Sequence, residues 1–412
     1  MSTIRKLTEK DIEDFVEISA NAYCGFGTLE QMRKAYREFF PIVVNELEDD
    51  DLFGLCREEK LHGGMRLIDY KMKLLSTKAA VGGIGCVAVD LVHKKEKVAK
   101  ELMEFACKYF REKGMSMAAL YPFRVDFYKN MGFGYGVERR QYKIEPKYFP
   151  KDSSKKHITY LNEESKDDIL DCYNSFLEKN NGMMEKTEPC LERLFRKDRK
   201  IVGYKKDGRV LGYINFSYKT KHLLKNDMVI HELIYENHEV LLELCTFLHF
   251  QADQFERIII NTPDEHIHYL VNNPENGEYE AFNSIKNEFG VSAIGLMYRV
   301  LDVRKLFKDL NSHNFNNQSC SLKLTVIDDF VKENDGSTVV EFKDGKATIC
   351  NSEDYEVEVE IKVSDFSSLI MGAISFKKLA EYGLARISDE KYMNIINNIF
   401  LTDKKPMCIT DF

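Results

Sequence analysis

The sequence has 412 residues, a formal net charge of -8 at pH 7, 44% hydrophobic residues and 31% charged residues. A chain of this length exceeds what one hydrophobic core normally supports, so we expect two or three domains of ordinary globular composition. The acidic balance argues against nucleic acid as a partner and weakly favours a cationic substrate.

Signals for membranes, export and metals are absent from the sequence. No apolar run approaches the ~20 residues that a membrane helix needs, and the N-terminal segment MSTIRKLTEKDIED lacks the apolar core of a signal peptide. The ten cysteines form no CxxC pair and no Cys/His cluster at zinc spacing, which indicates reduced, buried thiols. His266 and His268 lack a third ligand in sequence. We therefore expect a cytoplasmic protein with no membrane partner and no metal.

Residues 1–146 predict helices followed by a mixed sheet. Apolar residues from Ile12 to Ala20 follow one helical face, and Thr28 with Gln31 forms a capping box before a second helix. That second helix is expected at roughly 29–39. The remaining expected elements are strands at 52–56, 61–75 and 82–90, a long helix from 98 toward Gly114, a strand at 117–121, a short helix at 124–131 and a final strand at 133–144.

Residues 147–298 repeat this arrangement after a polar, proline-bounded stretch. A helix is followed by a hairpin turned at Asp207–Gly208, then by a strand, a helix and a strand, so we infer an internal structural duplication. From about Val300 the strands alternate apolar and polar residues, with a hairpin turn at Asp344–Gly345 and three helices after them. Residues 299–412 therefore predict a small domain of one sheet and helices.

The most informative segment is VAVDLVHKKEKVAKELM, residues 87–103. A buried strand here runs into a helix whose first turn holds Lys94, Lys95 and Lys97. Cations at a helix N-terminus oppose the macrodipole by ~0.3–1 kcal/mol each, whereas an anion bound to the free N–H groups reverses that penalty. The alternative is that the helix begins with solvent-exposed lysines that bind no ligand, and that Glu96 offsets part of their unfavourable interaction with the helix dipole. We favour an anion site.

This segment resembles the acetyl-CoA motif of the GNAT N-acetyltransferases, whose pyrophosphate loop reads Arg/Gln-x-x-Gly-x-Gly/Ala. Lys94 takes the first position, Lys97 stands where the first glycine is expected, and Ala99 takes the last position. A second signature, DFYKNMGF at 126–133, is similar to the Phe-Tyr-x-x-x-Gly-Phe segment of the same superfamily. One active unit, a second unit without the loop and a sterol-carrier-like domain together resemble the Eis (enhanced intracellular survival) acetyltransferases over essentially the whole chain.

The resemblance implies an α/β (α+β) fold with two tandem GNAT-like mixed sheets flanked by helices and a small C-terminal sterol-carrier-protein-2-like domain. It implies acetyl-CoA as cosubstrate, held by Val87, Ala88, Val89, Lys94, Lys95, Lys97, Val98 and Ala99. Tyr128 matches the family's general acid, although a tyrosine in this place can also be an ordinary packing residue. By position, the residues of the substrate wall are Tyr23, Phe26 and Cys86.

The last eight residues, KPMCITDF, are unusually apolar for the end of a chain. Ordering a terminus costs entropy that only burial offsets, so we expect this segment to be buried. Eis-type enzymes are inferred to use a C-terminal carboxylate on the amine proton. By that resemblance Phe412 is a catalytic residue and Asp411 adds negative charge to the substrate pocket. Simple hydrophobic docking of the tail is the alternative, and it does not exclude catalysis.

The function implied by the resemblance is acetyl transfer to primary amines of polycationic small molecules, such as aminoglycosides or polyamines, or to lysine side chains. It also implies a homo-oligomer, a hexamer built as a trimer of dimers. Two alternatives stay open. One is an enzyme for protein lysines only. The other is a non-catalytic protein that binds CoA or an acyl or lipid ligand. The missing loop glycine and the apolar–polar alternation of the third domain's strands favour this alternative.

Overall fold

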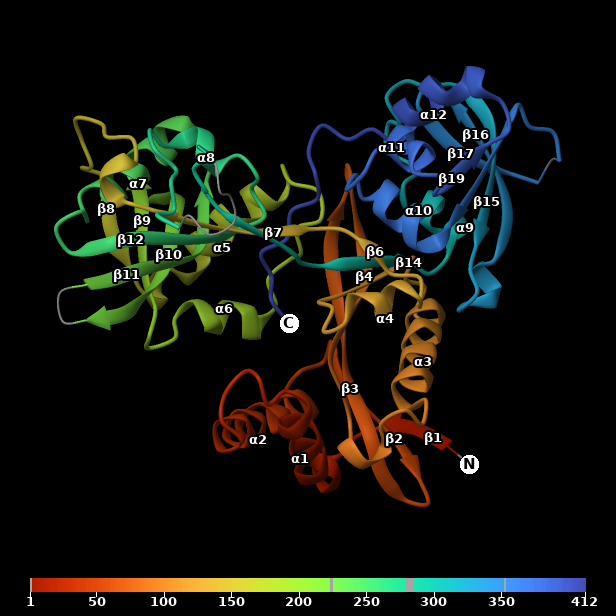
Figure 1. Ribbon diagram of the computed structural model, residues 1–412, viewed down its shortest axis with the longest axis horizontal. Coiled ribbons are helices and arrows are strands. Elements are labelled where there is room, and N and C mark those ends of the chain that lie inside the picture. The colour runs from red at the N-terminus through yellow and green to blue at the C-terminus, as the bar shows by residue number, and fades with distance from the viewer. Residues whose placement is uncertain (1, 223–224, 279–284, 352) are drawn as a thin grey trace. The chain divides into compact units, whose positions relative to one another are not determined.

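The computed structural model describes residues 2–222, 225–278, 285–351 and 353–412. Within these residues the strands form two seven-stranded sheets and one five-stranded sheet, with helices packed on them (Figure 1). The backbone divides into two compact units. One comprises residues up to Gly136, 296–405 and 412, and the other comprises 137–295 and 406–411. The mixed α/β fold class predicted from the sequence is confirmed.

The first sheet has the strand order β1-β2-β3-β4-β5-β14-β6. Strands β1 to β4 are antiparallel neighbours, whereas β4 and β5 are parallel and are joined through α3. The strands are β1 (Ser2–Lys6), β2 (Asp50–Arg57), β3 (Lys60–Leu74), β4 (Thr77–Val89), β5 (Met117–Leu120), β6 (Gly134–Tyr135) and β14 (Met297–Val300). The helices are α1 (Ile12–Ala22), α2 (Leu29–Asn45), α3 (Val98–Glu112) and α4 (Val125–Lys129).

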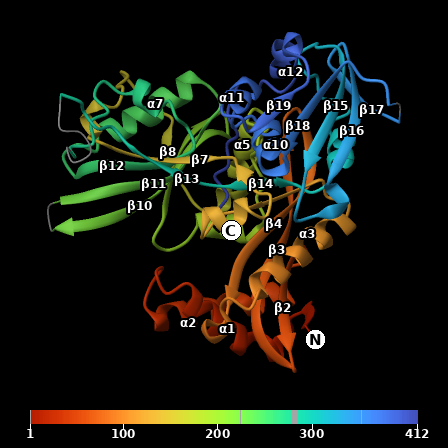
Figure 2. The same cartoon turned by 45° about the vertical axis from the view of Figure 1, so that its right-hand side comes forward.

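Helices cover both faces of the first sheet. Phe15 of α1 and Phe40 of α2 stack with ring centroids 4.8 Å apart and share a buried cluster with Ala88 of β4. The apolar stripe of α3, including Leu102 and Ala106, packs in a second cluster with residues of β3 and β4. Figure 2 shows α3 running beside these strands. The apolar faces of the amphipathic helices α1 and α3 are thus buried against the sheet.

Two boundaries in the first unit differ from the sequence prediction. The capping box of Thr28 and Gln31 is present, but α2 runs through Pro41 to Asn45 and does not end near residue 39. Proline inside a helix costs ~3 kcal/mol. Burial of Phe40 and Val43 on either side of it contributes a comparable stabilisation, at ~1.5–3 kcal/mol for each side chain.

The second difference is that the single strand predicted at 133–144 is wrong. The structure divides it into β6, which pairs with β14 in the first sheet, and β7 (Glu138–Ile144), which belongs to the second sheet. The change of sheet follows Gly136. A glycine is required at this position because a Cβ there would lie 2.2 Å from the ring of Tyr298. The chain therefore leaves the first unit after residue 136 and returns to it at residue 296. Both positions come before the domain boundaries predicted from the sequence, which are 146 and 298.

The second sheet has the order β13-β7-β12-β11-β10-β9-β8. Its parallel pair β11–β12, joined through α7, repeats the β4–α3–β5 arrangement of the first sheet, in agreement with the inferred duplication. The strands after β7 are β8 (Ile158–Leu161), β9 (Lys200–Lys206), β10 (Arg209–His222), β11 (Lys225–Tyr235), β12 (Phe255–Thr262) and β13 (Val291–Ile294). The helices are α5 (Lys166–Leu177), α6 (Glu188–Leu194), α7 (His238–His249) and α8 (Ile267–Leu270).

The third sheet has the order β17-β16-β15-β18-β19 and alternates buried and exposed residues, as predicted. Its hairpin turns at Asp344–Gly345, both with positive φ. The strands are β15 (Cys320–Ile327), β16 (Gly336–Lys343), β17 (Lys346–Cys350), β18 (Val357–Lys362) and β19 (Ala385–Ile387). The helices are α9 (Val303–Asp309), α10 (Val363–Ile370), α11 (Phe376–Glu381) and α12 (Met393–Ile399). In the described ranges, no helix combines the length and the apolar character needed to cross a membrane.

Candidate functional site

The first sheet opens where β4 and β5 part. Their parallel ladder ends at the pair Ile84–Leu120, while β4 itself continues to Val89. The stretch that carries Val87, Ala88 and Val89 is therefore bonded to β3 on one side, and no strand among the described residues pairs with it on the β5 side. Backbone groups left unpaired in this way can bind a ligand that lies along the strand.

A bulge in β4 lies at this opening. Gly64 of β3 is opposite Ala88 and Arg66 is opposite Gly85, so Cys86 and Val87 together face the single residue between them on β3. Cys86 has a φ of +48°, a conformation that costs a non-glycine residue ~1–3 kcal/mol and that gathers at functional sites. Burial raises the pKa of Cys86 to about 11, so the thiol is uncharged near neutral pH and lines the opening without acting as a nucleophile.

The basic turn follows β4 directly. A 3-10 turn at Leu91–His93 leads to Lys94, Lys95, Glu96 and Lys97, and α3 begins at Val98. The three lysine side chains are exposed, and no ion pair joins them to any residue in the described part of the chain. Three uncompensated cations at the start of a helix favour an anion there, because the helix N–H groups and the lysines act on it in the same direction.

Lys97 adopts the backbone conformation of the glycine it replaces. Its φ is +65° at the N-cap of α3, and that of Lys95 is +70°. The turn thus keeps the shape of a glycine-bearing loop at the cost of backbone strain in an L-residue.

We expect Lys97→Gly to raise the free energy of unfolding of the ligand-free protein by about 1 kcal/mol. The change removes left-handed strain and one cation opposing the helix dipole, which outweighs the greater entropy of glycine in the unfolded chain. Chemical denaturation measures this change in the free energy of unfolding. Lys94→Gly is the matched control, since Lys94 has an ordinary φ of -64°, and that variant should gain nothing. Equal effects in the two variants would contradict the strain argument.

Tyr128 lies on α4 with only 6% of its side chain exposed. Its ring contacts Phe127 and Phe133 edge-on, with centroids 5.2 and 6.1 Å away. Burial raises the pKa of Tyr128 to about 12, and its hydroxyl makes no hydrogen bond to any other described residue. The phenol is therefore a protonated donor without a protein acceptor, as a role toward a ligand requires.

Tyr23 lies close to this group. Its hydroxyl donates a hydrogen bond to the backbone carbonyl of Val87 at 3.1 Å, at the bulge. Burial raises the pKa of Tyr23 well above its usual range, with smaller contributions from Cys86 and Tyr128. The structure thus brings together three of the predicted site residues, Tyr23, Cys86 and Tyr128, around the opening of β4.

Exposed aromatic rings extend this surface. Phe26 is 75% exposed and Phe123 is 71% exposed. Their ring centroids lie 5.9 and 6.3 Å from that of Tyr23. Phe26 was predicted for the substrate wall, whereas Phe123 was not. The signal for Phe123 was its place just after β5, because residues at the carboxyl end of a parallel strand commonly form ligand sites.

Phe412 packs in the first unit beside β4. Its ring centroid lies 5.1 Å from that of Tyr70 and 5.5 Å from that of Tyr121. A Cβ built on Gly85 would lie 3.5 Å from the carbonyl carbon of Phe412. The carboxyl group of the last residue therefore lies next to the strand, immediately before the bulge, where only a glycine side chain separates them. Tyr70 and Tyr121 are contacts that the sequence reasoning missed.

Residues 406–411 lie in the second unit, where the predicted burial holds for Pro406, Cys408 and Thr410 but not for Asp411, which is exposed. Met407 donates its backbone N–H to the carbonyl of Asn181 at 2.7 Å. Met407 and Ile409 pack against the buried cluster around Tyr173, and the side chain of Cys408 is fully buried.

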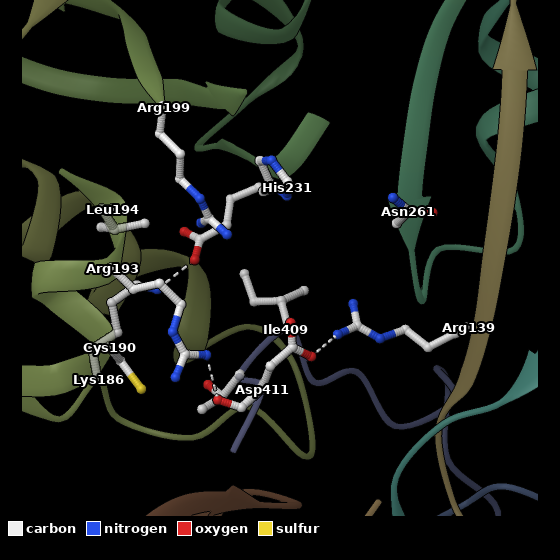
Figure 3. Close-up of a pocket in the computed structure, with 12 residues that line it drawn as sticks. Arg139, Lys186, Cys190, Arg193, Leu194, Arg199, His231, Asn261, Ile409 and Asp411 are labelled. Carbon is white, nitrogen blue, oxygen red and sulfur yellow. Dashed lines mark hydrogen bonds and ion pairs between the residues drawn. The ribbon is translucent and has the colours of Figure 1, made fainter. Parts of the chain in front are cut away.

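Asp411 lies in a basic cavity of about 350 Å³ in the second unit (Figure 3). Its carboxylate pairs with Arg139, and its carbonyl oxygen accepts a hydrogen bond of 2.7 Å from Arg193. The cavity is also lined by His231 and Asn261, which follow directly after the last pair of the β11–β12 ladder. The opening of the second sheet thus holds the chain's own tail, and the charge of Asp411 is compensated there. Its predicted role in a substrate pocket stays a prediction.

Arg139→Gln is expected to loosen the tail while leaving the fold intact. Asp411 is 65% exposed, so the pair contributes at most about 1 kcal/mol, equivalent to about a fivefold change in the population of the undocked tail. Carboxypeptidase release of the last residues should accelerate by that factor. Arg196→Gln removes an exposed arginine that pairs with Asp198 and serves as the matched control. Equal digestion rates in the wild type and both variants would show that Arg139 does not hold the tail.

Comparison with known proteins identifies the domains. An acetyltransferase (GNAT) domain model matches residues 3–136, a second acetyltransferase (GNAT) domain model matches 182–300, and a sterol carrier protein domain model matches 303–409. An uncharacterized N-acetyltransferase of Methanocaldococcus jannaschii is 26% identical over 137 residues, which is 32% of this chain. The match spans 60% of the length of that relative.

Solved structures match over the full length. A GCN5-related N-acetyltransferase from Anabaena variabilis has a TM-score of 0.84 at 15% identity, with all of both chains covered. A probable N-acyltransferase from Enterococcus faecalis has a TM-score of 0.80 at 15% identity, again over all of both chains. Eis1 from Mycobacterium abscessus has a TM-score of 0.78 at 15% identity with the same coverage.

These matches and the opened β4–β5 pair define the class: the chain carries two GNAT acetyltransferase domains followed by a sterol carrier protein domain. GNAT domains are acyltransferase domains. Within that class the chain has the fold of Eis1, and the GNAT and sterol-carrier-like domains predicted from the sequence are confirmed.

Proposed function

We propose that the protein is an acetyl-CoA-dependent N-acetyltransferase of primary amines. The observation that carries the proposal is the opening of β4 at its bulge, followed within a few residues by the unpaired lysines at the start of α3. The geometry offers a strand-like backbone edge for a pantetheine arm and a cationic helix start for a pyrophosphate, in that order along the chain.

The residues present fit acetyl-CoA, which supplies the acetyl thioester. Backbone groups of Val87, Ala88 and Val89 would hold the pantetheine arm, and a backbone N–H at the bulge would stabilise the negative charge that develops on the thioester oxygen. Lys94, Lys95 and Lys97, with the first N–H groups of α3 at Val98 and Ala99, would bind the phosphates.

Tyr128 acts as the general acid in this proposal. Transfer forms a C–N bond and breaks the C–S bond, and the leaving thiolate needs a proton. With a pKa of about 12, Tyr128 is protonated throughout the working range. Full transfer from such a phenol to a thiolate of reference pKa near 8.5 is uphill by about 5 kcal/mol. Tyr128 therefore acts chiefly by donating a hydrogen bond to the developing thiolate, and solvent completes the protonation.

Phe412 handles the amine proton. Its carboxylate, which lies next to Gly85, would orient the incoming ammonium and accept the proton directly or through a water molecule before the amine attacks. A carboxylate has a low reference pKa of about 3.5, so it relays the proton onward to solvent and does not retain it.

The acceptors we propose are polycationic small molecules, such as aminoglycosides or polyamines, and lysine side chains. The exposed rings of Phe26 and Phe123 beside Tyr23 offer faces to which an ammonium binds through cation–π attraction, worth ~0.5–2 kcal/mol for each contact. The formal net charge of -8 acts in the same direction.

The test is to incubate the protein with acetyl-CoA and a panel of amines while following release of free thiol. The panel should contain an aminoglycoside, a polyamine and a lysine peptide, and mass spectrometry should locate the added acetyl group. We expect thiol release that depends on the amine. If no amine releases thiol while acetyl-CoA still raises Tm by ligand binding, the chain is a CoA-binding protein without catalysis.

We further propose a cytoplasmic homo-oligomer, a hexamer, by likeness to Eis-type proteins alone. Sedimentation equilibrium should then give about six times the 48.0 kDa mass of the chain. A species of one or two chains would rule out the hexamer.

A further inference from the structure

A cluster of metal-ligating side chains lies beside the basic turn, outside the residues assigned above. His62 belongs to β3, His93 ends the 3-10 turn at Leu91–His93, and Glu96 lies among the lysines. One ligand atom from each of the three lies within 4.8 Å of the other two. We propose that His62, His93 and Glu96 form a binding site for one divalent transition metal ion, of which Zn²⁺ is the type.

The backbone holds the two histidines in place. The N–H of Asp90 donates to the carbonyl of His62 at 2.9 Å, and the N–H of His93 donates to the carbonyl of Asp90 at 3.0 Å. These two bonds tie the turn to β3, so that the imidazole rings stack with centroids 3.6 Å apart and planes 13° apart. The fold brings the two potential ligands together, and the ring of His93 has to turn out of the stack before both in-plane lone pairs can point at one ion.

His62 is a buried group without a partner. Its side chain is 9% exposed, and Nδ1 makes no hydrogen bond to any described residue. A buried polar atom in this state is costly to the fold, and a ligand at the ring would offset that cost. A packing role alone would be served equally well by an apolar ring, which has no nitrogen to satisfy.

The donor set determines the chemistry of the ion. Two imidazoles and one carboxylate match the ligands of Zn²⁺ sites that keep a fourth position for water, whereas Mg²⁺ and Ca²⁺ prefer oxygen ligands. His93 and Glu96 already meet, with Nδ1 and Oε2 3.2 Å apart. The side chains of His93 and Glu96 are partly exposed, so both can turn toward an ion held at the buried ring of His62.

Arg57 is the competing cation at this place. It contacts the Glu96 carboxylate at 3.2 Å and that of Glu101 at 2.8 Å. When Glu96 turns toward a metal ion, Arg57 keeps its shorter contact with Glu101. Competition from Arg57 should weaken metal binding at Glu96. An ion bound here would fix the turn that carries Lys94, Lys95 and Lys97.

The test uses the full chain, freed of metal by a chelator and titrated with Co²⁺ without CoA, because the CoA thiol itself binds metals. We expect one equivalent of Co²⁺ with visible absorption bands typical of a four- or five-coordinate site, displaced by Zn²⁺. His93→Gln and Glu96→Gln should each weaken binding at least tenfold, and His62→Gln should abolish it. Because His62 is buried, its variant is judged only if circular dichroism shows a native fold.

Two controls exclude other ligands. Cys24→Ser removes an exposed thiol, and His266→Gln removes an exposed histidine beside Glu265. Neither should change the titration. Absence of a Co²⁺ complex at millimolar metal, or unchanged binding in the His93→Gln/Glu96→Gln double variant, would overturn the site. The readout involves neither acetyl-CoA nor an amine, so it is independent of the proposed acetyl transfer.

Discussion

Tyr128→Phe is expected to lower kcat about 10²–10³-fold while KM for acetyl-CoA stays within about threefold. The change removes the only hydroxyl that we place at the sulfur, and loss of one hydrogen-bond donor to a charge that develops in the transition state costs about 10²–10³ in kcat. The ring contacts with Phe127 and Phe133 remain, so the fold should be unaffected. Steady-state kinetics with acetyl-CoA and the best amine of the panel measures both constants.

Tyr23→Phe is the matched control for this prediction. It removes a hydroxyl from the same cluster but one that bonds to the carbonyl of Val87. Loss of one neutral hydrogen bond costs about 1 kcal/mol, so kcat/KM should fall only about fivefold. If Tyr128→Phe is no worse than Tyr23→Phe, Tyr128 is a packing residue.

The pH profile gives a second check on Tyr128. Because burial raises its pKa to about 12, the phenol stays protonated while the acceptor amine loses its proton. The rate should therefore rise with pH as the free amine accumulates, without a descending limb below about pH 11. A descending limb near pH 8–9 that disappears in Tyr128→Phe would show that the phenol ionises far more easily than its burial implies.

Neutralising the terminal carboxylate is expected to have the second large effect. A semisynthetic chain that ends in Phe412 amide keeps the ring on Tyr70 and Tyr121 and removes only the charge. We expect kcat/KM for the amine to fall about 10²-fold, at the lower end of the range for a positioned proton acceptor. Thermal unfolding should change little, because the packing contacts are kept.

Two further chains separate charge from packing. Phe412→Ala keeps a carboxylate at the end of the chain but loses both ring contacts, and we expect a smaller loss, near tenfold. A chain that ends at Asp411 loses the ring and moves its terminal carboxylate back by one residue, so it should resemble the amide or fall below it. If the amide acetylates amines as fast as the native chain, the terminal charge has no part in the reaction and the tail only docks.

The local patterns of this sequence were sufficient for most of its elements. The capping box at Thr28, the stripe of α3 and the hairpin at Asp344–Gly345 each depend on residues within a few positions of one another. Short-range hydrogen bonds and side-chain periodicity decide such elements, so the sequence is enough. The basic turn and the segment around Tyr128 also lie in continuous stretches, which is why both site motifs were recognisable.

The misjudged elements are those in which distant pairing overrides local preference. Nothing near Gly136 in sequence shows that β6 and β7 join different sheets. The close approach of Tyr298 to Gly136 decides where the chain changes sheets, and Tyr298 lies on β14, far along the chain. Likewise α2 passes through Pro41 because buried neighbours outweigh the cost of the proline.

The sequence by itself determined the class of this protein and its order of domains, because motif spacing and periodicity are properties of neighbouring residues. Only the tertiary structure decided the bulge that gives Cys86 its positive φ, the pairing of Asp411 with Arg139, and the meeting of His62 with His93 and Glu96. Each of these depends on strand register or on contacts between residues that are far apart in sequence. Such contacts are set by burial and pairing over the whole fold, and no local pattern records them.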